Sequence, residues 1–160
     1  EACRNYSYPG CDRYYLRNVT NPCPEKKYPT PRCARECRDA PGAPDAWAGA
    51  KHYGERTYTV AGEEDIMAEV AANGPCEATI SMYDDFQYYE SGVYAHTHGG
   101  APEYLHCVKI IGYGTDPDGT KYWLCTNSWN EKWGEDGFFR IRRGVNECGI
   151  ESYVQCGVPK

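Results

Sequence analysis

Hydrophobic and polar residues follow regular patterns only after about residue 50. Residues 63–73 predict a helix, because apolar side chains recur along one face and acidic residues fill the first turn. Gly74 and Pro75 then end it. From Cys76 to Met82 every second residue is apolar, which predicts a strand with one buried face. The apolar face of the helix comprises Ile66, Met67, Val70 and Ala71.

The last sixty residues predict an antiparallel β region. The turn sequence Asp116-Pro117-Asp118-Gly119 separates two of its strands. Symmetric pairing about this turn sets Val108 opposite Asn127 and His106 opposite Trp129, within two residues either way. One helix followed by several strands indicates the α+β class, or a barrel-like half-domain. The expected strands are 92–94, 105–113, 121–129, 138–142 and 153–158, after a helical turn at 84–89.

The first fifty residues have a different character. They hold five of the ten cysteines and many prolines, without a long apolar period. Such a segment cannot bury a core, so we expect an extended surface region stapled by disulfides. Regular structure is expected from Lys51-His52-Tyr53-Gly54 onwards. This divides the chain into residues 1–50 and residues 51–160.

Composition excludes some functions and indicates a compartment. The net charge of −6 and the absence of a basic stripe argue against nucleic-acid binding, and no apolar run is long enough for a membrane span. Ten cysteines, with glycosylation sequons at Asn5 and Asn18, indicate an oxidising compartment. Zinc is the alternative explanation of the cysteines. Because no Cys-x2-Cys or His-x3-5-His pair is present, no metal site is expected.

The candidate chemistry lies in His106 and in Asn127-Ser128-Trp129-Asn130. An Asn side-chain oxygen can accept a proton from one imidazole nitrogen and so orient the other. Trp129 could cover this hydrogen bond, and a thiol placed against the ring would lose its proton to it. Taken alone, His106 is more typical of a packed strand residue and Asn127 of a strand end. Their combination across the turn favours a catalytic pair.

The nucleophile is not apparent in the chain. None of the ten cysteines has the Cys-Gly-Ser/Ala-Cys-Trp/Tyr surroundings of a papain-type nucleophile. That motif precedes its His by roughly 130–150 residues, which places it before Glu1. We therefore expect the nucleophilic Cys to come from a segment outside this chain.

Motifs lie along nearly the whole chain, from Lys51-His52-Tyr53-Gly54 through Asn127-Ser128-Trp129-Asn130 to Cys148-Gly149-Ile150-Glu151-Ser152. Together they resemble the C-terminal part of the cathepsin B group of papain-family cysteine proteases. The resemblance implies a papain-like fold, with residues 51–160 as its right-hand β-barrel domain and the N-terminal helical domain absent. It implies that His106 is the base, Asn127 its orienting partner and Trp129 their shield. The matching motifs are Lys51-His52-Tyr53-Gly54, Asp65-Ile66-Met67-Ala68-Glu69, Asn73-Gly74-Pro75, Ser91-Gly92-Val93-Tyr94, Tyr122-Trp123-Leu124, Asn127-Ser128-Trp129-Asn130, Trp133-Gly134, Gly137-Phe138-Phe139 and Cys148-Gly149-Ile150-Glu151-Ser152.

The resemblance also implies partners and a location. Expected partners are a light-chain-like N-terminal segment carrying the catalytic Cys, peptide or protein substrates, and cystatin-type inhibitors, with no cofactor. Such an enzyme is made as a zymogen and is lysosomal, endosomal or secreted. The alternative is a non-catalytic cathepsin B-like binding or matrix protein that lacks the nucleophile. Retention of both His106 and Asn127 favours the enzyme.

The cysteines of residues 1–50 resemble those of the cathepsin B occluding loop. This implies the pairs Cys3–Cys37 and Cys11–Cys23, with Cys33 bonded to the missing segment. Two alternatives are open for Cys76 and Cys156, which lie on predicted strands: a disulfide, or small buried thiols. The pairing of Cys107, Cys125 and Cys148 is left undetermined.

Three departures from the family pattern bear on specificity. The loop between Cys11 and Cys23 contains no His, whereas the family uses two there to hold a substrate carboxylate. Arg13 or Arg17 could pair with that carboxylate but are more typical of surface charges. This predicts an endopeptidase rather than a dipeptidyl carboxypeptidase. In the substrate pocket, Tyr153 replaces an acidic residue, which predicts preference for apolar side chains over Arg. Tyr104-Leu105 replaces two glycines before His106 and predicts a narrower cleft.

Overall fold

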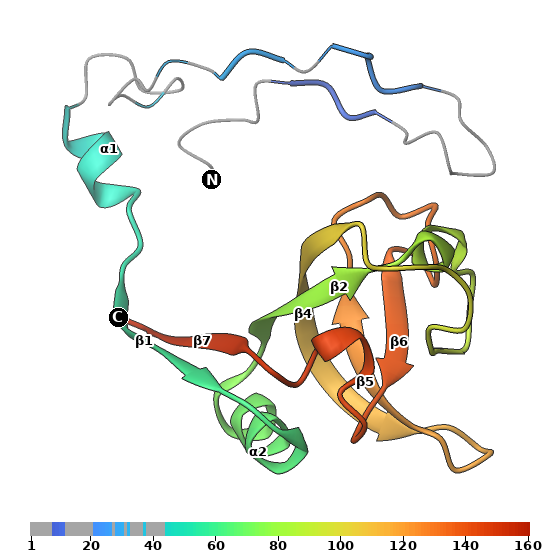
Figure 1. The fold of residues 1–160 in the computed structure, drawn as a ribbon. Coiled ribbons are helices and arrows are strands. Elements are labelled where there is room, and N and C mark those ends of the chain that lie inside the picture. The colour runs from blue at the N-terminus through green and yellow to red at the C-terminus, as the bar shows by residue number, and fades with distance from the viewer. Residues whose placement is uncertain (1–7, 12–20, 27, 31, 33–36, 38–43) are drawn as a thin grey trace.

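The computed structural model describes residues 8–11, 21–26, 28–30, 32, 37 and 44–160 (Figure 1). The sequence predictions for Cys3, Asn5, Arg13, Arg17, Asn18 and Cys33 lie outside these residues. None of the described helices has the length and apolar character needed to cross a membrane. The helical elements are α1 (Pro44–Gly49), α2 (Glu63–Asn73), η1 (Asp84–Tyr88) and η2 (Glu147–Gly149). The strands are β1 (Gly54–Val60), β2 (Cys76–Met82), β3 (Val93–Tyr94), β4 (Tyr104–Thr115), β5 (Lys121–Thr126), β6 (Phe138–Arg142) and β7 (Val154–Pro159).

The strands form one strongly curved sheet in the order β1-β7-β2-β4-β5-β6-β3 (Figure 1). Neighbouring strands are antiparallel, except that β3 runs parallel to β6. The mixed α+β architecture agrees with the fold class expected from the sequence. The antiparallel pairing expected of the last sixty residues is confirmed for β4, β5 and β6. The two-residue strand β3 precedes that region and pairs in parallel with β6.

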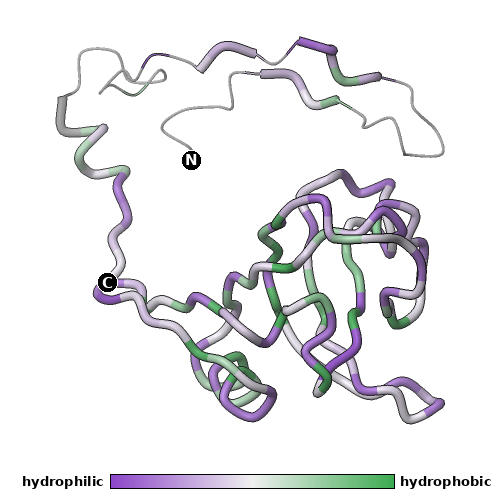
Figure 2. The backbone as a smooth tube through the Cα atoms, viewed as in Figure 1, coloured by the Kyte–Doolittle hydropathy of each residue, from purple (hydrophilic) through white to green (hydrophobic). Residues whose placement is uncertain are grey.

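Alternation along β2 and β4 separates the core from the outer face of the sheet. Every second residue of β2, from Cys76 to Met82, is buried. On β4, Val108 and Ile110 are buried, while Lys109 between them and Cys107 before them are exposed. Hydrophobic stretches gather in the sheet and α2, and the tip of the β4–β5 hairpin is hydrophilic (Figure 2). The largest fully buried side chains are Trp123, Phe86, Phe139, Ile66, Ile80, Ile110, Ile141, Ile150 and Val154.

A β-bulge in β4 sets the pairing with β5. Near the turn Thr115 pairs with Lys121, but beyond the bulge Ile110 pairs with Cys125. Ile111 is the extra residue, because Gly112 pairs with Leu124. A one-residue shift moves side chains to the other face of a strand. The offset beyond the bulge is the one that symmetric pairing about the turn requires.

A buried carboxylate fixes the start of β7 against the rest of the sheet. Glu151 is 7% exposed and accepts a hydrogen bond from Trp123 Nε1 at 2.9 Å. It also accepts from the backbone amides of Gly144 at 2.6 Å and Asn146 at 2.9 Å. These donors satisfy a charge that would otherwise be costly to bury. The Gly-Ile-Glu motif seen in the sequence thus holds the chain as it enters the last strand.

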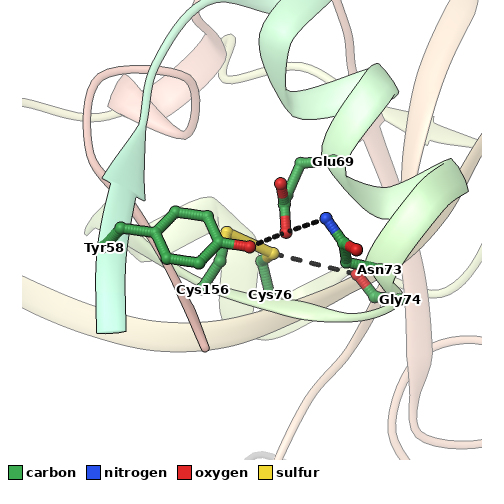
Figure 3. Close-up of a disulfide and its surroundings, with 6 residues drawn as sticks. All are labelled: Tyr58, Glu69, Asn73, Gly74, Cys76 and Cys156. Atoms are coloured by element: carbon green, nitrogen blue, oxygen red, sulfur yellow. Dashed lines mark hydrogen bonds between the residues drawn. A yellow bond between two sulfur atoms is a disulfide. The ribbon is translucent and has the colours of Figure 1, made fainter. Parts of the chain in front are cut away.

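A disulfide joins β2 and β7. Cys76 and Cys156 are bonded across the two neighbouring strands, with their Cα atoms 4.8 Å apart. Both are buried, and the side chain of Glu69 on α2 lies beside them (Figure 3). Of the two alternatives that the sequence left open, the structure therefore has the cross-strand disulfide.

The described parts of the cysteine-rich start are held by a second disulfide. Cys11 and Cys23 are bonded, and the Asn21 side-chain amide donates to the Gly10 carbonyl at 2.7 Å. The rings of Tyr8 and Tyr28 stack with centroids 4.5 Å apart. Cys37 is buried and disulfide-bonded. Contrary to the expectation of no regular structure before residue 51, the short helix α1 lies in this region.

The prediction from the sequence missed one strand and made another too long. Strand β1 was not expected, because its residues are mostly exposed and show no clear alternation of apolar side chains. The strand expected over 121–129 ends at Thr126, because the Asn127 amide donates to the Gly137 carbonyl and the chain turns away. Asn127 and Trp129 therefore lie on a loop.

Candidate functional site

A hydrogen bond between the imidazole ring of His106 and the side-chain amide of Asn127 forms the centre of the site. His106, near the start of β4, and Asn127, just after β5, bring Nε2 and Oδ1 to 2.9 Å. An amide oxygen can only accept, so Nε2 carries the proton. The other ring nitrogen, Nδ1, is then free to exchange a proton with a reacting group. The bulge in β4 makes this contact possible because it places both side chains on one face of the sheet.

Trp129 covers the hydrogen bond. Its indole stacks on the His106 ring with centroids 5.2 Å apart and planes 28° apart. Behind Trp129, edge-to-face contacts with Phe86 at 5.7 Å and Trp133 at 5.1 Å hold the indole in place. Trp133 is buried and donates from Nε1 to the Gln87 carbonyl at 3.0 Å. This packing excludes water from one side of the ring and strengthens the hydrogen bond beneath it.

The loop that carries Asn127 and Trp129 depends on a glycine. Gly134 has a φ of 60°, and a Cβ at this position would lie 2.6 Å from the Phe138 carbonyl oxygen. A side chain there would force the loop away from β6. Within the loop, Asn127 Oδ1 also accepts from the Ser128 amide at 2.8 Å, which fixes the rotamer that faces His106.

One polar atom of the pair is unsatisfied. Asn127 Nδ2 is buried and has no hydrogen-bond partner among the described residues. A buried amide without a partner typically costs about 1–3 kcal/mol. Asn127 is one of the residues that line an open groove of about 320 Å³, together with Glu77, Cys107 and Lys109.

None of the three free thiols that the structure describes has the character of a nucleophile. Burial raises the pKa of Cys125, and it raises the pKa of Cys148 to about 12. Cys107 is exposed, but its hydrogen bond to the Glu77 carboxylate raises its pKa as well. A nucleophilic cysteine requires a lowered pKa. The described residues therefore provide an imidazole oriented by an amide, without an activated thiol.

Comparison with known proteins gives this geometry its context. The family model described as "Papain family cysteine protease" matches residues 3–158. The chain is 45% identical to "Cathepsin B-like cysteine proteinase 6" of Caenorhabditis elegans, over 99% of this chain and 41% of that protein. It is 46% identical to "Cathepsin B-like protease 1" of Arabidopsis thaliana, over 93% and 39%. Among solved structures, "proCathepsin B S9 from Trypanosoma congolense" matches with a TM-score of 0.74 and 37% identity, over 91% of this chain and 47% of that one.

The chain belongs to the papain family of cysteine proteases. It spans less than half the length of the curated cathepsin B-like relatives that it matches. The papain-like fold and the likeness to cathepsin B expected from the sequence are both confirmed.

In this papain-family chain a second set of residues lies on the outer face of the sheet. Thr79 pairs with Cys107, the residue after His106. Tyr153 precedes β7 and is 51% exposed, one residue beyond the pair Ala78–Val154, so it lies next to Thr79. Its hydroxyl accepts a hydrogen bond from Gln155 Nε2 at 3.2 Å. The substrate-pocket role that the sequence assigns to Tyr153 stays a prediction. Its proximity to Thr79 and Cys107 could not be seen in the sequence, because only strand register brings these residues together.

The residues before His106 are solvent-facing. Leu105 is 70% exposed and Tyr104 is 52% exposed. Leu105 lies on the same face of β4 as Cys107, since alternate residues of a strand share a face. The narrower cleft that the sequence predicts from Tyr104 and Leu105 stays a prediction.

The short helix η1 packs against Trp129 and also anchors the loop that leads to β4. Phe86 of η1 contacts Trp129, while its neighbour Asp85 accepts hydrogen bonds from the Tyr94 hydroxyl at 2.7 Å and the Thr97 amide at 3.1 Å. His96 Nδ1 lies 3.1 Å from the same carboxylate, and its ring stacks on Tyr83. Partial burial alone would raise the pKa of Asp85, but the hydrogen bonds from Tyr94, Thr97, His96 and His98 outweigh it and lower the pKa to about 2.

This carboxylate predicts a pH-dependent contribution to stability. A lowered pKa in the folded state stabilises the fold above the ordinary Asp range, and the effect disappears as the pH falls through about 4 towards 2. We expect Asp85→Asn to lower the free energy of unfolding by about 2 kcal/mol near neutral pH. The difference from wild type should shrink towards zero near pH 2. Urea unfolding of the full-length protein across this range measures it.

Asp65→Asn is the matched control, because Asp65 is an exposed carboxylate at the start of α2. It should change stability by well under 1 kcal/mol at every pH. A loss at Asp85→Asn that persists unchanged at the acid end would contradict the role assigned to the charge.

Proposed function

We propose that the protein containing this chain is a cysteine protease that hydrolyses peptide bonds, with His106 as general base and acid and Asn127 as its positioning partner. The supporting observation is the 2.9 Å hydrogen bond between His106 Nε2 and Asn127 Oδ1 beneath Trp129. The family and the cathepsin B-like relatives support the same reaction.

In the proposed mechanism His106 Nδ1 takes the proton of a cysteine thiol. The thiolate attacks the peptide carbonyl carbon, and the resulting imidazolium gives its proton to the leaving amine as the C–N bond breaks. His106 then takes a proton from water, which attacks the thioester and releases the acid and the thiol. Asn127 keeps the ring in one tautomer and one orientation through both halves, as the third member of such a triad does.

The nucleophile in this proposal belongs to a light-chain-like segment outside the chain. Two observations support it: the raised pKa values of Cys107, Cys125 and Cys148, and the orphaned Asn127 Nδ2, which an acceptor on that segment could satisfy. Peptide and protein substrates, and cystatin-type inhibitors, are the further partners that we expect. The proposed location is lysosomal, endosomal or secreted, which suits the disulfides at Cys11–Cys23 and Cys76–Cys156.

The catalytic proposal predicts large losses when either member of the pair is removed. His106→Ala should lower kcat/KM of the full-length enzyme by roughly 10³-fold or more, and Asn127→Ala by about 10²-fold. His98→Ala is the control and should leave kcat/KM unchanged, because its exposed side chain lies outside the pair. Hydrolysis of a fluorogenic peptide measures all three.

Covalent labelling separates the enzyme from a non-catalytic cathepsin B-like binding protein. An epoxide inhibitor should label the wild-type protein at one cysteine in the segment preceding this chain, and labelling should slow with the loss of peptidase activity in His106→Ala. A protein that takes up no label and cleaves no peptide, although folded, would support the binding or matrix alternative instead.

Endopeptidase activity is proposed over dipeptide removal, because the segment between Cys11 and Cys23 has no His to hold a C-terminal carboxylate. We expect peptides with a free C-terminus and their C-terminal amides to be cleaved at similar rates, within about threefold. Replacing two adjacent residues of the 12–20 segment by His should raise cleavage of the free acid only. Efficient stepwise release of dipeptides by the wild-type enzyme would refute this proposal.

Tyr153, with Thr79 and Cys107, is proposed to line the pocket for the second substrate side chain on the acyl side. A phenol offers area without charge, so Phe-Arg substrates should be cleaved faster than Arg-Arg substrates. Tyr153→Glu should shift the ratio of the two kcat/KM values towards Arg-Arg by roughly tenfold. Tyr53→Glu makes the same chemical change at an exposed tyrosine before β1 and should leave the ratio unaltered.

A further inference from the structure

The Cys76–Cys156 disulfide lies against a carboxylate on a third element. Ligand atoms of Glu69, Cys76 and Cys156 all lie within 4.8 Å of one another. The two cysteines are only 3% and 6% exposed, and Glu69 is half-buried. Figure 3 shows the Glu69 side chain descending from α2 onto the sulfur atoms, which come from β2 and β7. Two consecutive elements, α2 and β2, and the distant strand β7 thus bring two sulfurs and one carboxylate together.

The carboxylate is held in place by neighbouring side chains. The Tyr58 hydroxyl donates to Glu69 Oε1 at 2.5 Å, and Asn73 Nδ2 donates to the same oxygen at 3.1 Å. Tyr58 comes from β1, where it pairs with Cys156 across the sheet. Carboxylates that bind metal ions are typically oriented by such outer hydrogen bonds.

We propose that reduction of this disulfide creates a binding site for a thiophilic divalent cation such as Zn²⁺, with Cys76, Cys156 and Glu69 as ligands. Two thiolates and one carboxylate are a donor set that suits zinc. Tetrahedral ligands at Zn–S distances of about 2.3 Å lie about 3.7 Å apart. The cluster's spread of at most 4.8 Å is close to this, so side-chain rotation suffices once the S–S bond is open.

The chemistry balances with an external reductant. A dithiol gives two electrons and two protons to the S–S bond, leaves two thiols at Cys76 and Cys156, and itself becomes a disulfide. Binding of the cation then releases the two thiol protons as two metal–sulfur bonds form. In the oxidised protein neither sulfur is a thiolate, so the same three side chains offer only the Glu69 carboxylate.

Electrostatic attraction favours binding of a divalent cation once the disulfide has been reduced to two thiols. Cys76 and Cys156 are buried and lie beside the Glu69 carboxylate, so two thiolates there would add to an existing negative charge. A divalent cation offsets the two thiolate charges and restores a connection between β2, β7 and α2. The site is therefore controlled by redox state: a covalent link when oxidised and a coordinate link when reduced. This inference does not depend on the proposed peptidase activity.

The test uses the full-length protein with its reactive cysteine blocked by an epoxide inhibitor. After treatment with a phosphine reductant, which supplies no thiol ligand, the protein is titrated with Zn²⁺ against a chelating dye. Cd²⁺ replaces Zn²⁺ in a second titration that records thiolate-to-metal charge-transfer absorption. We expect one equivalent of each cation to bind the reduced form, and the thiolate band to be absent in the oxidised form.

Variants identify the ligands. Glu69→Gln keeps the disulfide and should weaken Zn²⁺ binding at least tenfold, whereas Glu64→Gln, an exposed change on the same helix, should not alter it. The double variant Cys76→Ser with Cys156→Ser sets the background from all other thiols. If that variant does not fold, comparison of Glu69→Gln with Glu64→Gln still decides. Equal binding by these two Gln variants, or no gain of binding on reduction, would overturn the proposal.

Discussion

The site depends on one irregularity in the pairing of β4 with β5. Side chains alternate between the faces of a strand, so a continuous register from the turn would place His106 and Asn127 on opposite faces. The extra residue Ile111 shifts the pairing by one before the strands reach the site. The 2.9 Å contact between ring and amide is a consequence of that shift. Trp129 stacks on the His106 ring of this pair and is held in place by Trp133 and Phe86.

The segments that support the site are themselves held in place by packing and hydrogen bonds. Element η1 contributes Phe86, which packs against Trp129, and Asp85, which holds the loop before β4. Gly134 lets the loop after Asn127 lie close to β6. Rigid placement of this kind is what an oriented catalytic group requires, because a small displacement of the ring would lose the alignment.

Much of this structure could be predicted from local pattern, and the remainder depends on long-range contacts. Helix 63–73 and strand 76–82 follow directly from the spacing of their apolar residues, and the turn at 116–119 gave the approximate pairing of β4 with β5. Strand β1 has no such pattern, because it lies at the edge of the sheet formed by the described strands and most of its residues are exposed. The placement of Thr79 and Cys107 beside Tyr153 depends on register, and the proximity of Glu69 to Cys76 and Cys156 depends on tertiary packing. Ligand-spacing rules read along the sequence cannot find such a cluster.

The raised pKa values of Cys107, Cys125 and Cys148 have a practical meaning for studies of the whole protein. Electrophiles react with thiolates, so at mildly acidic pH these three sulfurs stay largely inert. Among the described residues, these thiols should therefore compete only weakly for an alkylating reagent that is added to the whole protein.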